Sequence, residues 1–218
     1  VGREIKDQMK RQAIVLGGDN FRIKTWAIFR RGRQGKKLVD GVSLSVKSGE
    51  ILGIAGLRGS GTSQLLMGIF GVYGYSVAKN ITLNGKNVII KYPQDSINNG
   101  IALLTNDKKA TGLVLPMSII DNVCLADLET LTKYGWRNVT NEKKVAQKHG
   151  KTLNFRVPSY ESEVVNLSGG NQQKVAFAKW LQIKPQVLLL DEPTKGIDVG
   201  TKQDLYLLMN ELTKTGIS

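Results

Sequence analysis

The sequence has little cysteine, a shortage of acidic residues and no long apolar run. Cys124 is the one cysteine among 218 residues, which excludes an internal disulfide framework and the usual multi-cysteine zinc sites and suits a reducing compartment. No stretch approaches the roughly 18 to 20 apolar residues that a membrane-spanning helix needs, and the N-terminal residues carry no apolar signal segment. We therefore expect a cytosolic chain that neither crosses a membrane nor is exported.

Basic residues outnumber acidic ones, with 31 Lys and Arg against 18 Asp and Glu and a net charge of +13. The 41% hydrophobic and 22% charged content is otherwise ordinary, which excludes a disordered or collagen-like chain. The basic excess fits nucleic acid, an anionic membrane surface or phosphate-bearing ligands. Charge alone does not choose among these three classes, so the motifs must.

Short apolar runs alternate with helical patterns along the chain. We expect a strand or hairpin in the basic N-terminal region, and strands at residues 51–55, 101–104 and 187–190, the last a buried parallel strand because its apolar run is unbroken. Helical patterns are predicted at 62–70, 119–131, 141–155, 169–184 and 205–212. This alternation predicts an α/β fold with a mostly parallel sheet, an antiparallel N-terminal part and an inserted helical subdomain at about 112–166.

The loop from Gly56 to Ser63 has the spacing of a phosphate-binding loop, where glycines let backbone N–H groups converge on phosphate oxygens. Thr62 stands where that pattern has lysine, and Ser63 keeps the hydroxyl that would bind Mg²⁺. Without the lysine, binding loses about 1.5–3 kcal/mol, roughly ten- to a hundredfold. A tight strand-to-helix turn is the alternative. The predicted nucleotide-binding residues of the loop are Gly56, Arg58, Gly59, Ser60, Gly61, Thr62 and Ser63.

Two carboxylates follow the strand predicted at residues 187–190. Ligands of open α/β sheets collect at the carboxyl ends of strands. Asp191 would hold Mg²⁺, directly or through water, and Glu192 would polarise an attacking water. A solvated acidic turn is the competing interpretation.

Ser168, Gly169 and Gly170 open a helix shortly before that strand. Ser168 can cap the helix and the two glycines allow close backbone approach, so this is a second candidate anion-binding terminus. A plain helix cap is the alternative. Its position before an apolar strand that ends in Asp-Glu favours the functional interpretation.

These motifs together resemble a nucleotide-binding domain of the ATP-binding cassette transporter family. The resembling segments are the Walker A loop at 56–63, the signature at 167–172, the Walker B strand at 187–192 and the D-loop at 196–200. The form Leu-Ser-Gly-Gly-Asn-Gln-Gln-Lys is similar to the second, C-terminal cassette of the tandem ATPase subunits of ribose-, galactoside- and xylose-type sugar importers. Residues 1–4 are similar to the junction after the first cassette. The resemblance implies one P-loop NTPase domain over residues 1–218, as part of a longer tandem chain.

The resemblance also implies roles for residues that the motifs alone do not assign. Phe29 lies where an aromatic residue stacks on adenine, although Trp26 competes for that role and simple packing is an alternative. Asn106 stands where the family has the Gln or Glu of the Q-loop, and Asp198 belongs to the D-loop. His149 is expected to be a solvated surface residue, and no switch histidine is assigned.

In this family, ATP lies between the Walker A loop of one cassette and the signature of another. The resemblance therefore implies an ATPase domain of a monosaccharide importer, with ATP and Mg²⁺, that lends Ser168, Gly169 and Gly170 to a partner's site. Implied partners are the N-terminal cassette or a second ATPase subunit, transmembrane permease subunits and, indirectly, a sugar-binding protein, at the cytoplasmic face of the membrane. The alternatives are a soluble cassette protein that acts on nucleic acid, which we do not expect, and a regulatory domain that binds nucleotide without hydrolysis.

Overall fold

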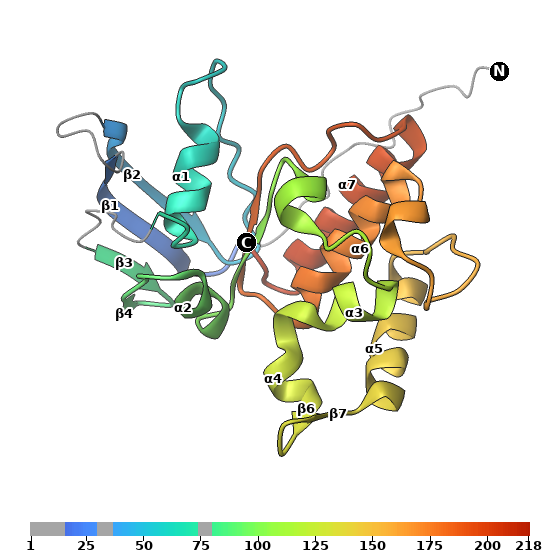
Figure 1. Ribbon diagram of the computed structural model, residues 1–218. Coiled ribbons are helices and arrows are strands. Elements are labelled where there is room, and N and C mark those ends of the chain that lie inside the picture. The colour runs from blue at the N-terminus through green and yellow to red at the C-terminus, as the bar shows by residue number, and fades with distance from the viewer. Residues whose placement is uncertain (1–15, 30–36, 74–79) are drawn as a thin grey trace.

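The computed structural model describes residues 16–29, 37–73 and 80–218 (Figure 1). Four antiparallel strands form the first sheet in the order β2-β1-β3-β4. They are β1 (Asp19–Phe29), β2 (Lys37–Lys47), β3 (Asn80–Leu83) and β4 (Lys86–Val88). The N-terminal antiparallel hairpin expected from the sequence is confirmed.

A parallel pair of strands forms the centre of the molecule. Strand β5 (Ile101–Leu104) pairs with β8 (Val187–Leu190), with Ile101 opposite Val187 and Leu104 opposite Leu190. Every residue of β5 is buried, as expected for a strand covered on both faces. The carboxyl ends of the two strands therefore lie side by side.

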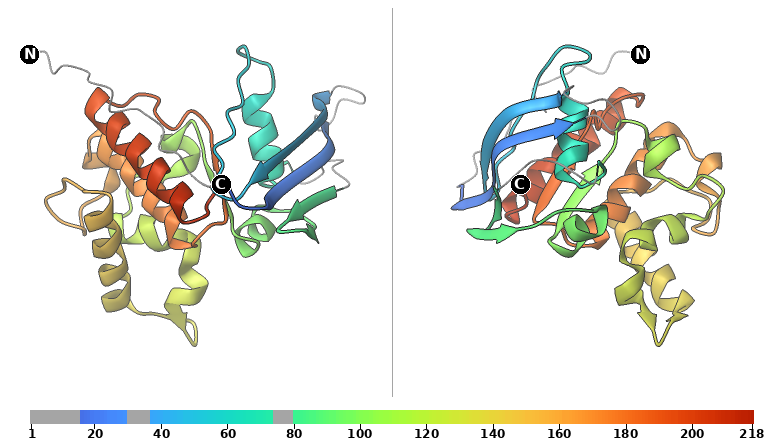
Figure 2. Two further views of the ribbon diagram at one scale, coloured as in Figure 1. Left: turned by 180° about the vertical axis from the view of Figure 1, so that it is seen from behind. Right: turned by 60° about the vertical axis from the view of Figure 1, so that its left-hand side comes forward.

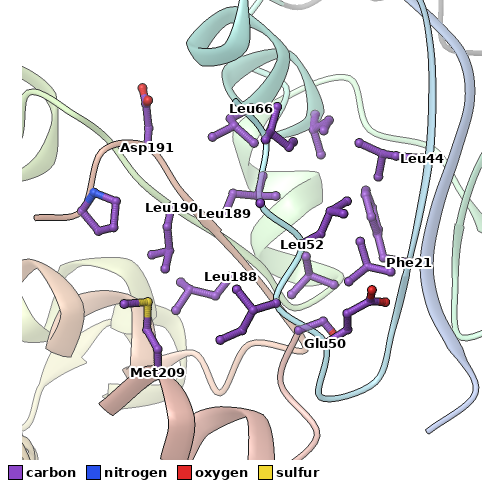
Figure 3. A pocket seen from close by; sticks show the side chains of 18 of the residues that line it. Phe21, Leu44, Glu50, Leu52, Leu66, Leu188, Leu189, Leu190, Asp191 and Met209 are labelled. Atoms are coloured by element: carbon purple, nitrogen blue, oxygen red, sulfur yellow. The ribbon is translucent and has the colours of Figure 1, made fainter. Parts of the chain in front are cut away.

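The strand expected at residues 51–55 is not formed. Ile51, Leu52 and Ile54 are each about two-fifths exposed at 41–42%, and a cavity of about 560 Å³ separates this run from β8 (Figure 3). A strand exists only where a neighbour pairs with its backbone, and no described strand pairs with this run. At the start of β8, Ser218 accepts a hydrogen bond from the Leu188 N–H and donates one to the Gln186 carbonyl.

The helices agree in position with most of the sequence-based expectations. The stretch expected at 119–131 is helical but divided into three short segments, and the helix expected at 141–155 starts and ends two to three residues earlier. The helices are α1 (Thr62–Ile69), α2 (Pro93–Asn98), the π-helical η1 (Lys108–Gly112), α3 (Ile119–Cys124), η2 (Leu125–Asp127), α4 (Leu128–Leu131), α5 (Val139–Thr152), η3 (Val164–Asn166), α6 (Gly169–Gln182) and α7 (Val199–Lys214).

A small hairpin lies between α4 and α5, formed by β6 (Thr132–Lys133) and β7 (Trp136–Arg137). It projects away from the rest of the chain in every view (Figures 1 and 2). The assignment of residues 112–166 to one inserted helical subdomain stays a prediction. Among the described residues, no helix is long and apolar enough to span a bilayer.

Helix α6 is the most buried helix of the fold. Its residues Val175 to Ala178 are inaccessible to solvent, and it contacts α3, α5 and β5. Helix α7 runs beside it (Figures 1 and 2), where Lys174 of α6 forms an ion pair of 2.8 Å with Asp204 of α7. This packing fixes the N-terminus of α6 against that of α7.

Candidate functional site

The glycine loop before α1 has a backbone that only glycine adopts comfortably. Gly59 and Gly61 have φ angles of +87° and +95°, in the left-handed region that disfavours side chains. A Cβ on Gly61 would lie 2.7 Å from the Leu38 carbonyl oxygen. Gly61 also caps α1 without a side-chain hydrogen bond, which leaves the first N–H groups of the helix available for an anion.

Three residues predicted from separate motifs meet behind this loop. The Ser63 hydroxyl, in the first turn of α1, donates a hydrogen bond of 3.0 Å to Asp191 Oδ1 at the end of β8. The Asn106 side chain, which follows β5, lies 3.5 Å from the Ser63 hydroxyl and donates to it. The parallel pairing of β5 and β8 brings Asn106 and Asp191 to the same edge.

Asp191 is suited to a metal ion. Its side chain is buried, with 6% of the residue exposed, and its Oδ2 atom is buried with no hydrogen-bond partner among the described residues. Desolvation raises the pKa of this carboxyl above its usual value, and the nearby Glu192 adds to the shift. A buried, unpaired carboxylate oxygen beside the Ser63 hydroxyl oxygen is the kind of donor that Mg²⁺ prefers.

Glu192 has a different environment from its neighbour Asp191. Its φ of +46° places a non-glycine residue in the left-handed region, which costs on the order of 1 kcal/mol and is typical of functional sites. Its side chain is 57% exposed, and Oε2 accepts an ion-pair contact of 2.7 Å from Lys195. That contact occupies Oε2 and leaves the other carboxylate oxygen to accept a hydrogen bond from water.

The cavity beside this cluster has an apolar wall and a polar end (Figure 3). Leucines of β8, α1 and the 51–55 run converge in it together with Phe21, whereas Asp191 stands apart at the end of β8. Gly56 and Thr62 of the glycine loop also line it. Thr62 brings no charge to this end of the cavity.

The second predicted site lies at the N-terminus of α6. Ser168 caps the helix by accepting a hydrogen bond of 3.3 Å from the Asn171 N–H. Gly169 and Ser168 are exposed, whereas Gly170 is buried. A Cβ on Gly170 would lie 2.6 Å from the Thr201 hydroxyl, so glycine permits the close approach of α6 and α7.

Asp198 is the cap of α7 and completes this second site. Its carboxylate accepts hydrogen bonds from the Thr201 N–H at 3.0 Å and from the Thr201 hydroxyl at 2.7 Å. Those backbone and side-chain hydrogen bonds lower the pKa of Asp198. Ser168, Gly170 and Asp198 therefore form one cluster at two adjacent helix termini.

The two sites lie on different parts of the molecule. The glycine loop leads into α1, whereas the N-termini of α6 and α7 lie together on the other side of the β5–β8 pair (Figure 1). The chain therefore presents two separate candidate sites.

Some expected residues are placed differently or lie outside the description. The side chains of Phe29 and Trp26 lie outside the described residues, so the expectation that one of them stacks on a base stays a prediction. Arg58 is exposed on the glycine loop. His149 is half-buried, not fully solvated, because its Nε2 atom lies 2.9 Å from Gln182 Oε1, and burial lowers its pKa.

Two lysines that the sequence did not single out hold the segment after β5. The Lys108 ammonium donates a 3.1 Å hydrogen bond to the Gly169 carbonyl at the start of α6. Lys179, further along α6, is buried and donates to the Gly112 carbonyl. Together they fasten both ends of η1 to α6. A lysine in a polar loop is expected to be solvated, so the sequence did not predict the contact of Lys108 with α6.

Comparison with curated proteins gives full-length coverage of this chain. It is 43% identical over 217 residues to the xylose import ATP-binding protein XylG of Thermoanaerobacter pseudethanolicus, covering 100% of this chain and 43% of that protein. It is 39% identical over 216 residues to the ribose import ATP-binding protein RbsA of Geobacillus kaustophilus, covering 99% of this chain and 42% of that protein. The chain thus spans less than half the length of these relatives.

Comparison with solved structures shows the same fold. A nucleotide-free ATP-binding cassette from an ABC transporter superposes with a TM-score of 0.72 at 23% identity, over 91% of this chain and 79% of that one. A dimeric, post-hydrolysis cassette bound to ADP and Pi gives 0.73 at 22% identity, over 90% and 84%. The expected α/β P-loop fold is confirmed. A family profile described as ABC transporter matches residues 39–195, and the chain therefore belongs to that family.

Proposed function

We propose that this chain is an ATP-binding cassette of a ribose- or xylose-type monosaccharide importer, in which ATP binding and hydrolysis drive transport. The relatives named as xylose and ribose import ATP-binding proteins, at 39–43% identity, support this substrate class. They favour it over the alternative of a cassette that acts on nucleic acid.

The observation that carries the proposal is the convergence of Ser63, Asn106 and Asp191 behind the glycine loop. Mg²⁺, when bound with the nucleotide, would neutralise charge on the phosphate oxygens. Ser63 and Asp191 would hold it, with Asn106 beside them. Backbone N–H groups of the loop and of the first turn of α1 would bind the phosphates, because Thr62 supplies no positive charge.

Glu192 is proposed to accept the proton of the water that attacks the γ-phosphorus, with ADP as leaving group. Its exposed side chain and its position directly after Asp191 support this role. The ion pair with Lys195 occupies one carboxylate oxygen and leaves the other for the water.

The terminus of α6 is proposed to act in trans. Ser168, Gly169 and Gly170 lie apart from the chain's own glycine loop, so their natural ligand is the γ-phosphate held by another cassette. N–H donors and a helix N-terminus aimed at developing phosphate charge stabilise the transition state. The main catalytic contribution of this chain is therefore to the partner's ATP. The partner is the N-terminal cassette of a tandem chain or a second ATPase subunit.

In the assembled importer the cassette would contact permease subunits at the cytoplasmic face of the membrane, with a sugar-binding protein acting on the other side. The test is ATPase activity of the full tandem protein with its permease in lipid vesicles. Ser168→Arg should abolish transport-coupled turnover, because it places a long side chain in the partner's phosphate site. Ser45→Arg, at an exposed position of β2, is the matched control and should leave turnover unchanged.

Glu192→Gln in the same assembly separates the two sites. If the chain works mainly in trans, turnover should fall far less with Glu192→Gln than with Ser168→Arg. Full activity of the Ser168→Arg protein, or complete loss with Glu192→Gln alone, would contradict the proposed division of labour.

A further inference from the structure

A basic and aromatic surface extends from the projecting hairpin of the helical region along α5. Residues 132–152 contain six lysines and arginines and one acidic residue, Glu142. We call the exposed part the tip surface. It consists of Tyr134, Trp136 and Val139 at the hairpin and of Lys144, Lys148 and Lys151 along α5. The hairpin and the glycine loop lie at opposite ends of the molecule in every view (Figures 1 and 2).

The lysines form a stripe on the outer face of α5. Lys144, Lys148 and Lys151 follow the i, i+4, i+7 spacing of one helix face and are all exposed. The opposite face, with Glu142, Ala146 and Gly150, is buried against the fold. No carboxylate in the described part of the chain forms an ion pair with the three lysines of the stripe.

The aromatic end of the surface is unusually exposed. Tyr134 is 91% exposed, Trp136 80% and Val139 63%. Tyr134 and Gly135 are the central residues of the hairpin turn, with φ angles of +53° and +80°. Such a turn normally takes Asn-Gly, since a bulky residue at positive φ costs on the order of 1 kcal/mol. The turn therefore carries an aromatic residue at a position that disfavours a bulky side chain.

The hairpin is held firmly in this position. Arg137 forms ion pairs with Asp121 at 2.5 Å and with the fully buried Glu142 at 2.6 Å. These contacts tie β7 to α3 and α5. Trp136 is thus presented on a supported element, and its exposure is a property of the fold.

We propose that the tip surface docks onto the headgroup region of an anionic lipid bilayer. Trp and Tyr favour the membrane–water interface because they combine an apolar ring with a polar tip. An unpaired lysine stripe beside them supplies the attraction to acidic lipids. The proposal goes beyond the importer function, because it assigns a direct lipid contact to the cassette itself and requires neither nucleotide nor permease.

The composition of the surface favours lipid over a polyanion such as RNA. A polyanion-binding site needs positive charge along its length, whereas here the lysines end at a protruding, uncharged aromatic and valine cluster. Removing that apolar cluster from water is favourable, and a polyanion does not provide such burial. At a bilayer surface the lysines can contact acidic headgroups while the aromatic and valine cluster contacts apolar chains.

The test is flotation of the 218-residue chain with neutral phosphatidylcholine vesicles and with vesicles that also contain phosphatidylglycerol. The chain should float only with the acidic vesicles. Lys144→Glu, Lys148→Glu and Lys151→Glu combined should weaken binding on the order of a hundredfold, at about fivefold per lysine. Lys47→Glu, Lys86→Glu and Lys91→Glu combined are the matched control. They change the net charge equally at exposed positions of the antiparallel sheet region and should leave most of the binding.

Tryptophan fluorescence gives a second readout that net charge does not move. Acidic vesicles should shift the emission of the wild-type chain to shorter wavelength, and Trp136→Phe should lose that shift while it keeps binding. Equal losses in the two triple variants would overturn the proposal, as would equal binding to neutral vesicles. So would binding to an RNA oligonucleotide as tight as to acidic vesicles with no spectral shift. Unchanged melting curves confirm that every variant is folded.

Discussion

At the scale of single residues, Lys179 is a buried ionisable side chain. Its side chain is 7% exposed, its ammonium donates to the Gly112 carbonyl, and it lies 4.7 Å from the centre of the Trp180 ring. Desolvation lowers its pKa to about 8. Between pH 8 and the ordinary lysine value near 10.5, the unfolded chain therefore holds a proton at this residue that the folded chain has released.

Because the unfolded state binds more protons in that window, stability should rise with pH through it. Relative to Lys179→Met, the wild-type free energy of unfolding should increase by roughly 3 kcal/mol between pH 8 and pH 10.5. Urea unfolding of both proteins at the two pH values measures this difference. Lys86→Met, at an exposed position, is the control. If the free energy of unfolding changes equally with pH in the wild-type protein and in Lys179→Met, the buried-charge account is contradicted.

At the scale of elements, the N-termini of α6 and α7 pack closely because Gly170 has no side chain. A Cβ at Gly170 would overlap the Thr201 hydroxyl at 2.6 Å and its methyl at 3.3 Å. Gly170→Ala should therefore destabilise the fold by about 1–3 kcal/mol, as overpacking does. Thr201→Ala in the same protein should recover part of that loss because it removes the atoms that clash. Urea unfolding measures both free energies.

Gly53→Ala is the control for this prediction, since nothing lies within 4 Å of a Cβ at that position. It should change the free energy of unfolding by less than about 1 kcal/mol. Equal costs of the two alanines, or no recovery with Thr201→Ala, would show that α6 and α7 are not held at this contact.

The capping role of Ser168 can be separated from its proposed phosphate role. Ser168→Asp keeps a good helix cap but places a negative charge where the partner's phosphate would bind. The isolated chain should keep its stability within about 0.5 kcal/mol, while ATPase activity of the assembled importer should fall by at least a hundredfold. Ser168→Ala removes the helix cap without adding a charge. It should lose about 1 kcal/mol of stability and keep more ATPase activity than Ser168→Asp. Activity retained in Ser168→Asp would contradict the phosphate role.

The elements also show where sequence patterns suffice. The unbroken apolar run of β8 and the serine cap of α6 predicted both elements in place, because burial and capping act within a few residues. The apolar run at 51–55 was wrongly predicted as a strand, because strand formation depends on a neighbour in space. Lys108 and Lys179 escaped prediction for the same reason, since their carbonyl partners lie 61 and 67 residues away in sequence.

At the scale of the whole molecule, the chain carries two candidate half-sites, for which we propose different ATP molecules as ligands. The glycine loop with Ser63 and Asp191 forms one, and the paired termini of α6 and α7 form the other. Ser63 and Asp191 were each assigned to Mg²⁺ from their motifs, and the structure brings their side chains to 3.0 Å. The left-handed backbone of Gly59 and Gly61, which leaves N–H groups of the loop and of α1 available, follows only from the structure. We propose that this loop still binds Mg²⁺-ATP through its backbone, at reduced affinity.

Calorimetric titration of Mg²⁺-ATP into the 218-residue chain, beside Thr62→Lys and Asp191→Ala, tests that claim most directly. We expect measurable binding of Mg²⁺-ATP to the wild-type chain. Thr62→Lys should tighten this binding by roughly ten- to a hundredfold. Asp191→Ala should lose the binding that depends on Mg²⁺. Identical titrations for all three folded proteins would contradict the account, because neither the loop nor the Ser63–Asp191 pair would then contact the nucleotide.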